Sequence, residues 1–395
     1  MNLTLLERFD GDLSGWTLGT VGGTVSIVIQ DHSTKLRLND TSASSYVSAT
    51  KTYEEPSCKY LLEYDINVAT SGVGICDLLD SSDNVIVTVD VGTIASTLSF
   101  STNSISGTTS SFPHDTHVQV ILVVDPISKV VSCYMTDQTP SPNYRPLKRV
   151  GINKSYTGSV SKLLFKTATT NTGIVYIDEV KIYTPRMVVI GDSICDGKLI
   201  WANEPTAPAG RLTAAEDQTS SPSYQQSLLI GSNVWVGNRA FGGSNTSTVL
   251  PQIPIGIIEH GFTSVFASVG HNDLGIYSYA TITANYNSII STLQAAGITG
   301  KNILFGNIKP AYTLIGKESV RQQVNSWIAT RMAQIGGVLI DNATSLRDPS
   351  DYTRLNPIYD GGDGVHLNKV GSGVMAANVF NGMAIPRASQ GYLVY

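Results

Sequence analysis

The sequence predicts two domains: an all-β sandwich over residues 1–185 and a three-layer α/β domain with a parallel sheet over residues 186–395. Before residue 186, short runs of alternating apolar residues are separated by clusters of Ser, Thr, Asn, Asp and Gly, and no long segment has helical period. After it, apolar strands alternate with amphipathic helices. A chain of 395 residues is long enough for two or three domains, each with its own core.

The first domain contains seven runs that we predict to be strands. They are residues 25–29, 60–66, 85–91, 118–124, 130–135, 163–166 and 174–182. Many short strands separated by turns are typical of an antiparallel sandwich of the jelly-roll kind. The segment from Phe9 to Trp16 opens the region and residues 176–183 close it. We expect these terminal segments to pair side by side.

This first domain resembles the jelly-roll modules of carbohydrate-binding and concanavalin-like families. The likeness rests on the opening segment from Phe9 to Trp16, on residues 117–120 followed by 130–134, and on the closing strand at 177–180. The resemblance implies an accessory domain that binds carbohydrate. The alternatives are a spacer, a shield for the second domain, or a surface through which the chain forms homo-oligomers, and the sequence leaves them open.

The second domain begins after Thr184, Pro185 and Arg186, which we predict to be a short hinge. Its predicted strands are residues 187–190, 234–236, 264–268, 303–307 and 338–341. Its predicted helices are residues 221–230, 281–296, 317–335 and 368–383. Alternation of this kind specifies a parallel sheet covered on both faces, with the reacting groups at the carboxyl ends of the strands.

The composition argues against several classes of function. There are 26 Lys and Arg against 31 Asp and Glu, a formal net charge of −5, and no basic run could neutralise successive phosphates. We therefore expect no nucleic-acid partner. No apolar stretch approaches the roughly 20 residues that cross a bilayer, so we expect no membrane span. Cys58, Cys76, Cys133 and Cys195 match no zinc spacing, and we expect free buried thiols and no metal.

The amino terminus has neither the basic head nor the long apolar segment and small-residue cleavage site of a secretory signal. We therefore expect either a mature form or export by another route. The low charge and the many Ser, Thr and Gly residues of the first half are typical of proteins that act outside cells or on virus particles. The expected location is accordingly extracellular or virion-associated.

Polar residues follow three predicted strands of the second domain, at the same edge of the sheet. Ser193 follows the first strand, where a rigid support would hold its hydroxyl as a nucleophile requires, although Gly-Asp-Ser is also a common turn sequence. Gly242 and Gly243 follow the second, and their N–H groups could stabilise an oxyanion or belong to an ordinary βα turn. Asn272 follows the third strand, and its amide is a neutral donor suited to an alkoxide.

Asp363 and His366 form a local acid–base pair in the sequence. A spacing of three residues can place both side chains on one side of a turn, so that the carboxylate holds Nδ1–H and leaves Nε2 free to take a proton. Capping of a helix is the alternative role for the pair. Asp360 is a rival for the acidic role at a less usual spacing from the histidine. His271 is a rival base, although a surface or helix-capping role suits it better.

Together these motifs resemble those of the SGNH (GDSL) hydrolase superfamily, over about half of the chain. The matching blocks are Gly191-Asp192-Ser193, then Asn238 with Gly243, then Gly270-His271-Asn272-Asp273, and last Asp363-Gly364-Val365-His366. Ile194 and Cys195 follow the first block where the family often has Leu-Thr or Ile-Thr, and Ala240 stands where many members carry glycine. The family's oxyanion glycine usually lies five residues after the asparagine, which implies Gly243.

The resemblance implies a serine esterase with a flavodoxin-like α/β domain. Ser193, Asp363 and His366 would be its catalytic triad. The backbone N–H groups of Ser193 and Gly243 and the side-chain amide of Asn272 would form the oxyanion hole, and Asp192 and Asp273 would support the loops. We expect this chemistry to need no cofactor and no metal.

Three functions are compatible with these residues. The first is hydrolysis of O-acetyl esters on a carbohydrate or polysaccharide, by a secreted enzyme or on a phage tail. It is favoured by the sugar-binding likeness of the first domain and by the lack of a long apolar lid segment in the second. The second is a general short-chain carboxylesterase or lipase that acts on other small esters. The third is a glycan-binding or virion adhesion protein whose esterase fold has lost turnover, against which the intact triad residues argue.

Overall fold

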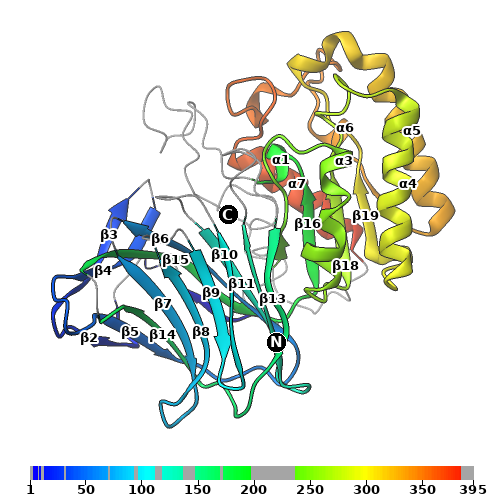
Figure 1. Ribbon diagram of the computed structural model, residues 1–395. Coiled ribbons are helices and arrows are strands. Elements are labelled where there is room, and N and C mark those ends of the chain that lie inside the picture. Colours follow the sequence, from blue (N-terminus) through cyan, green and yellow to red (C-terminus); the bar gives the residue numbers. More distant parts are fainter. Residues whose placement is uncertain are drawn as a thin grey trace, which may run out of the picture.

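The computed structural model describes most of the sandwich and most of the α/β domain. The described residues are 3–7, 9, 13–30, 33–69, 72–92, 97–111, 118–136, 147–169, 172–196 and 236–383. Within them a two-sheet antiparallel sandwich lies beside a parallel sheet covered by helices (Figure 1), so the predicted fold class is confirmed. The predicted helix at 221–230 and the first two residues of the predicted strand at 234–236 lie outside the described residues.

Two antiparallel sheets form the sandwich. The larger has the order β13 (Leu147–Ser155), β12 (Val130–Thr136), β11 (Val118–Asp125), β6 (Tyr60–Ala69), β15 (Gly173–Tyr183), β4 (Ser33–Asp40), β3 (Gly23–Gln30), with β1 (Leu3–Glu7) also paired to β15. The smaller has the order β10 (Ile105–Ser111), β9 (Thr97–Thr102), β8 (Val85–Gly92), β7 (Val73–Leu79), β14 (Lys162–Thr167), β5 (Ser48–Thr52), β2 (Trp16–Gly19). Alternate side chains point into the core, as in β14, where Leu163 and Phe165 are buried and Leu164 is half-buried.

The two ends of the sandwich meet, and the closing strand is the predicted one, but the opening strand is not. The closing strand β15 pairs antiparallel with β1, from Leu3 opposite Tyr183 to Glu7 opposite Val180. The predicted opening segment instead ends in Trp16, which begins β2 in the other sheet. Phe9 lies between β1 and β2, buried and with a left-handed backbone (φ 57°), a conformation that ends a strand. The chain therefore changes sheet within the segment that we expected to be the terminal strand.

The second domain is built on a parallel sheet. Its strand order is β17 (Val236–Asn238), β16 (Met187–Gly191), β18 (Ser264–Ser268), β19 (Ile303–Gly306), β20 (Val338–Ile340). In chain order this is 2-1-3-4-5, the flavodoxin-like arrangement. Such a sheet binds its ligand at the carboxyl ends of the strands, where the first strand has neighbours from both directions. Here that first strand is β16.

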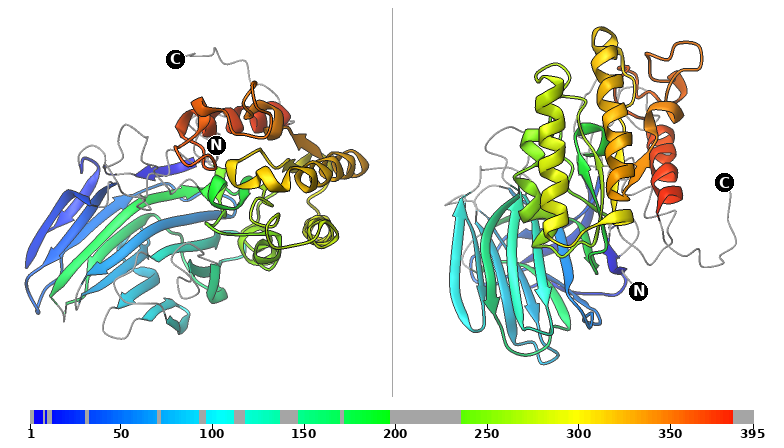
Figure 2. Two further views of the ribbon diagram at one scale, coloured as in Figure 1. Left: turned by 90° about the horizontal axis from the view of Figure 1, so that it is seen from above. Right: turned by 90° about the vertical axis from the view of Figure 1, so that its right-hand side faces the viewer.

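Helices cover both faces of this sheet (Figure 2). They are α1 (Ser193–Asp196), α3 (Thr246–Val249), α4 (Tyr279–Ala295), α5 (Glu318–Ile335), α6 (Asn342–Ser345) and α7 (Lys369–Gly382), with shorter or irregular turns at Pro254–Ile258, Gly300–Asn302, Tyr312–Lys317 and Pro357–Tyr359. Val188 packs with residues of α4 and α5, whereas the next residue, Val189, packs with residues of α7. The helix predicted from residue 281 begins two residues earlier, at Tyr279 of α4. Ser278 caps it by accepting a hydrogen bond from the N–H of Thr281.

The predicted hinge does not separate two independent cores. Ile121 and Val123 of β11 lie on the outer face of the sandwich and belong to the same apolar cluster as Ile257 and Phe262 of the second domain. The intervening residue Leu122 points into the sandwich core. Because both faces of β11 are covered, its side chains form a nearly continuous apolar run.

Polar contacts add to this junction. Glu63 of β6 forms a buried ion pair with Arg239, which directly follows β17, and it accepts a hydrogen bond from the hydroxyl of Tyr183 at 2.7 Å. Glu259 of the second domain accepts a bond from the hydroxyl of Tyr134 at 3.0 Å and pairs with Arg149. The sandwich is thus fused to the α/β domain through apolar packing and two ionic contacts.

The four cysteines are all free thiols. Cys76, Cys133 and Cys195 are buried, as expected, but Cys58 is exposed and the expectation is wrong for it. It lies in the connection between β5 and β6, outside the sandwich core. In the described ranges, no helix is both long and apolar enough to cross a membrane.

Candidate active site

Ser193 lies where the buried strand β16 ends and the single turn of α1 begins. Every residue of β16 is buried, and a side chain at Gly191 would come within 2.2 Å of the carbonyl oxygen of Ser268 on the neighbouring strand. Asp192 is buried and accepts a hydrogen bond from the N–H of Ile194 at 3.0 Å, which is the contact that its predicted supporting role requires. Burial raises the pKa of Asp192 to about 6.

The structure brings Ser193, His366 and Asp363 together. Nε2 of His366 lies 2.7 Å from Oγ of Ser193, and Nδ1 lies 2.7 Å from Oδ2 of Asp363. The other carboxylate oxygen of Asp363 accepts bonds from the N–H groups of Val365 at 2.9 Å and His366 at 2.8 Å. Partial burial opposes ionisation of Asp363, but these hydrogen bonds outweigh it and hold its pKa well below the usual range.

Two of the predicted oxyanion donors, Gly243 and Asn272, lie on loops that are tied to one another. Gly243 has a left-handed backbone (φ 75°) with no atom within 4 Å of where a Cβ would stand, so the loop turns there beside open space. The amide of Asn272 donates to the carbonyl of Ser244 at 2.8 Å. Asp273 is buried and accepts bonds from the backbone N–H and the hydroxyl of Thr246. Each of the two predicted supporting aspartates therefore holds a loop of the site.

The comparison with protein families agrees with this geometry. Residues 189–374 match the model of the GDSL-like Lipase/Acylhydrolase family. The carboxyl-terminal half of the chain is a GDSL-like acylhydrolase domain. The match contains every residue of the site described so far. No curated protein matches the chain.

Solved structures similar to the GDSL-like domain include a GDSL-like lipase from Bacteroides thetaiotaomicron, at 17% identity over 50% of this chain and 87% of that one, with a TM-score of 0.38. A member of the lipolytic protein G-D-S-L family from Veillonella parvula is similar at 19% identity over 50% of this chain and 96% of that one, with a TM-score of 0.37.

Asp360 and His271, the alternatives for the acid and the base in the GDSL-like domain, make other contacts. The carboxylate of Asp360 accepts bonds from the N–H groups of Gly362 at 2.8 Å and Gly364 at 2.9 Å, so it holds the turn before His366. The Nε2 atom of His271 lies 3.2 Å from the hydroxyl of Thr313. Burial, followed by the nearby charge of Lys309, lowers the pKa of His271 to about 3, so its ring is neutral.

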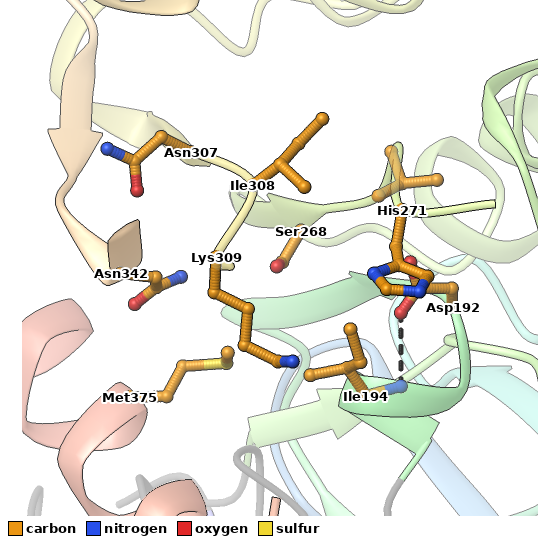
Figure 3. Close-up of a pocket in the computed structure, with 10 residues that line it drawn as sticks. Asp192, Ile194, Ser268, His271, Asn307, Ile308, Lys309, Asn342 and Met375 are labelled. Atoms are coloured by element: carbon orange, nitrogen blue, oxygen red, sulfur yellow. Dashed lines mark hydrogen bonds between the residues drawn. The ribbon is translucent and has the colours of Figure 1, made fainter. Parts of the chain in front are cut away.

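Polar residues also follow the fourth strand of the GDSL-like domain, and the sequence motifs did not indicate them. Asn307 donates to Asp341 at 2.9 Å, and Lys309 extends into a pocket together with Asp192, His271 and Asn342 (Figure 3). The expectation that reacting groups lie at the carboxyl ends of parallel strands, which pointed to Ser193, applies to these residues too, because they follow a strand at the same edge of the sheet. In the described part of the chain, no three His, Cys, Asp or Glu side chains are grouped so as to hold a metal ion.

Proposed function

We propose that this protein is a serine esterase that removes O-acetyl groups from a carbohydrate through an acyl-enzyme. Its family supports hydrolysis of an ester, and the acetylated glycan is the finer part of the proposal. The observation that carries the reaction type is the continuous chain of two 2.7 Å contacts from Asp363 through His366 to Ser193. That chain connects a carboxylate, an imidazole and a hydroxyl in the order that nucleophilic catalysis requires.

In the proposed reaction, Oγ of Ser193 attacks the carbonyl carbon of the ester while Nε2 of His366 takes the hydroxyl proton. Asp363 orients the imidazole and stabilises the imidazolium. His366 then gives the proton to the leaving sugar hydroxyl, and the acetyl group stays on Ser193 as an ester. A water molecule, deprotonated by His366, attacks that ester; the bond to Oγ then breaks, acetate leaves, and His366 returns the proton to Oγ of Ser193.

The charge of each tetrahedral intermediate develops on the former carbonyl oxygen. The proposed donors to it are the N–H of Ser193, the N–H of Gly243 and the amide of Asn272. The bond from Asn272 to Ser244 uses one of the two amide hydrogens, which leaves one for the oxyanion and fixes the amide plane. Donors fixed before the reaction need no reorganisation when the charge appears, and each contributes roughly 100-fold to 1,000-fold in rate.

The choice of an acetylated carbohydrate has two supports. The first is the sandwich, whose architecture is common among sugar-binding modules. The second is the lack of a long apolar lid segment in the sequence of the second half. Action outside cells or on a virus particle suits both the polar composition of the first half and a polysaccharide substrate.

The experiment that tests the reaction type is labelling with a fluorophosphonate, followed by mass spectrometry of the peptide that contains Ser193. An adduct at that residue is expected; a binding protein without turnover would give none. Acetate release from a panel of acetylated polysaccharides then tests the substrate class. Rates on p-nitrophenyl esters should fall steeply from acetyl to octanoyl, whereas a rise with chain length would favour the general carboxylesterase or lipase.

A further inference from the structure

A buried lysine contacts the loop that carries His366. Lys309 follows β19 at the carboxyl edge of the parallel sheet, is only 3% exposed, and donates a hydrogen bond from its ammonium group to the backbone carbonyl of Val365. Figure 3 shows its side chain extending from the chain after β19 toward Ile194, with Asp192 and His271 across the pocket. No step of the proposed reaction uses this cation.

Charged and titratable groups from several elements surround the ammonium group. They are Asp192 from the turn after β16, His271 from the loop after β18, Arg321 from α5, and Asp360 and Asp363 from the loop before α7. Burial lowers the pKa of Lys309 to about 8, and the carboxylates act against that shift. A buried ammonium group costs stability unless its partners compensate, and here the carbonyl of Val365 and the nearby carboxylates are those partners.

We propose that Lys309 is a positioning residue for ester hydrolysis, a role that rests on the function proposed above. Its ammonium group binds the carbonyl of Val365, the residue before His366. This bond fixes residues 360–366, the acid–base loop, against the end of β19. The strand β19 belongs to the same sheet as β16, which ends beside Ser193. Lys309 therefore sets the 2.7 Å separation between Nε2 of His366 and Oγ of Ser193.

The hydrogen bonds to the two carboxylates of the acid–base loop fix the conformation of the loop but not its position relative to the sheet. Asp360 and Asp363 accept them from backbone N–H groups of the loop itself, so those partners move with the loop. Lys309 and the N–H of Tyr312, which donates to the carbonyl of Gly364 at 2.9 Å, join the loop to the segment after β19. A misplacement of about 1 Å at a reacting group can cost roughly 100-fold in rate.

The first test is Lys309→Met, which keeps the length of the side chain and removes both the charge and the bond to Val365. We expect kcat on p-nitrophenyl acetate to fall about 10-fold to 100-fold and KM to change less than about 3-fold. Lys181→Met is the matched control, because Lys181 is also buried but lies in the sandwich, paired with Glu179. It should lower Tm and leave kcat of the folded protein unchanged. A folded Lys309→Met variant with the parental kcat overturns the proposal.

The pH profile separates positioning from a merely structural role. The parental kcat/KM should fall about 5-fold as pH rises through about 8, where the ammonium group loses its proton and its bond to the carbonyl weakens. Lys309→Arg keeps its charge and should hold its rate through that range. A parental profile that is flat from about pH 7 to about 9.5 overturns the proposal even where neither variant folds. Failure of the parent to hydrolyse esters or to react with a fluorophosphonate is a different result, which refutes the proposed function itself.

Discussion

Replacement of Glu63 by Gln should destabilise both domains at once. The side chains of Glu63 and Arg239 are each only 3% exposed, and they join β6 of the sandwich to the segment after β17. Glutamine keeps the shape and one acceptor oxygen but leaves the guanidinium group of Arg239 without a countercharge in a buried position. Arg239 also donates to the carbonyl of Asn238 at 2.7 Å, within the loop that leads to the predicted oxyanion glycine.

The expected loss can be estimated from the burial of the pair. Removing one partner of a buried ion pair costs about 3–5 kcal/mol, because the remaining charge keeps its desolvation cost and loses its compensation. At about 2 °C per kcal/mol for a cooperative unit of this size, Tm should fall by roughly 6–10 °C. Asp351→Asn is the control, because Asp351 and its partner Arg354 are 41% and 54% exposed and solvent screens such a pair, so its Tm should hardly change.

Differential scanning calorimetry, with esterase activity measured along the same temperature ramp, is the assay. The parent should unfold in one transition in which activity and heat absorption change together, and Glu63→Gln should shift that whole transition. Glu63→Leu combined with Arg239→Met should recover much of the loss, because neither charge is then buried. The coupling of the domains would be refuted if the protein unfolded in two separate transitions, and if Glu63→Gln lowered only the Tm of the transition in which activity is retained.

Three further predictions concern the site. Ser193→Ala should abolish hydrolysis with Tm within about 1 °C of the parent, since a single hydroxyl contributes little packing; equal activity in variant and parent would remove the serine from the mechanism. Asp363→Asn should lower kcat about 10,000-fold. Because the pKa of Asp363 is held below its usual value, its charge stabilises the fold above about pH 4, and this contribution is lost as pH falls further, so urea melts of the variant should show a smaller loss of stability below pH 4 than those of the parent. Tyr312 is 62% exposed beside the acid–base loop, and Tyr312→Ala should raise KM for acetylated oligosaccharides but not for p-nitrophenyl acetate. Tyr352 is 61% exposed, and Tyr352→Ala should change neither KM. An equal effect of both substitutions on KM would argue against a sugar contact at Tyr312.

Local signals were enough to predict the fold class and the groups that meet in the site. The period of the apolar residues distinguishes strands from helices, and parallel strands bring their carboxyl ends to one edge, so Ser193 and Asn272 are both expected at that edge of the sheet. Asp363 and His366 are close in sequence, which makes their contact predictable from spacing alone. Their approach to Ser193, 173 residues away, needed the further assumption that both ends of the domain reach the same edge of the sheet.

Contacts between distant segments were harder to predict, because the same side chain could pack equally well against several different segments. Phe9 and Trp16 carry no sign of which sheet each joins. Lysine usually lies at the surface of a protein, and only the three-dimensional structure shows that Lys309 is buried against the acid–base loop. The junction of the domains did leave a trace: Ile121 and Val123 are apolar on the face of β11 opposite to Leu122, a pattern that indicates burial on both sides and argues against a free hinge.

The segment from Asp363 to His366 carries both the carboxylate and the imidazole of the triad within a single turn. Asp363 binds Nδ1 of His366 and the backbone N–H groups of Val365 and His366, and these bonds within the turn orient the imidazole. Proton transfer from the serine therefore depends on the gap between this turn and Ser193. A natural or engineered change that alters that gap, even from behind the turn, would scale the rate while leaving the identity and the order of the reacting groups untouched.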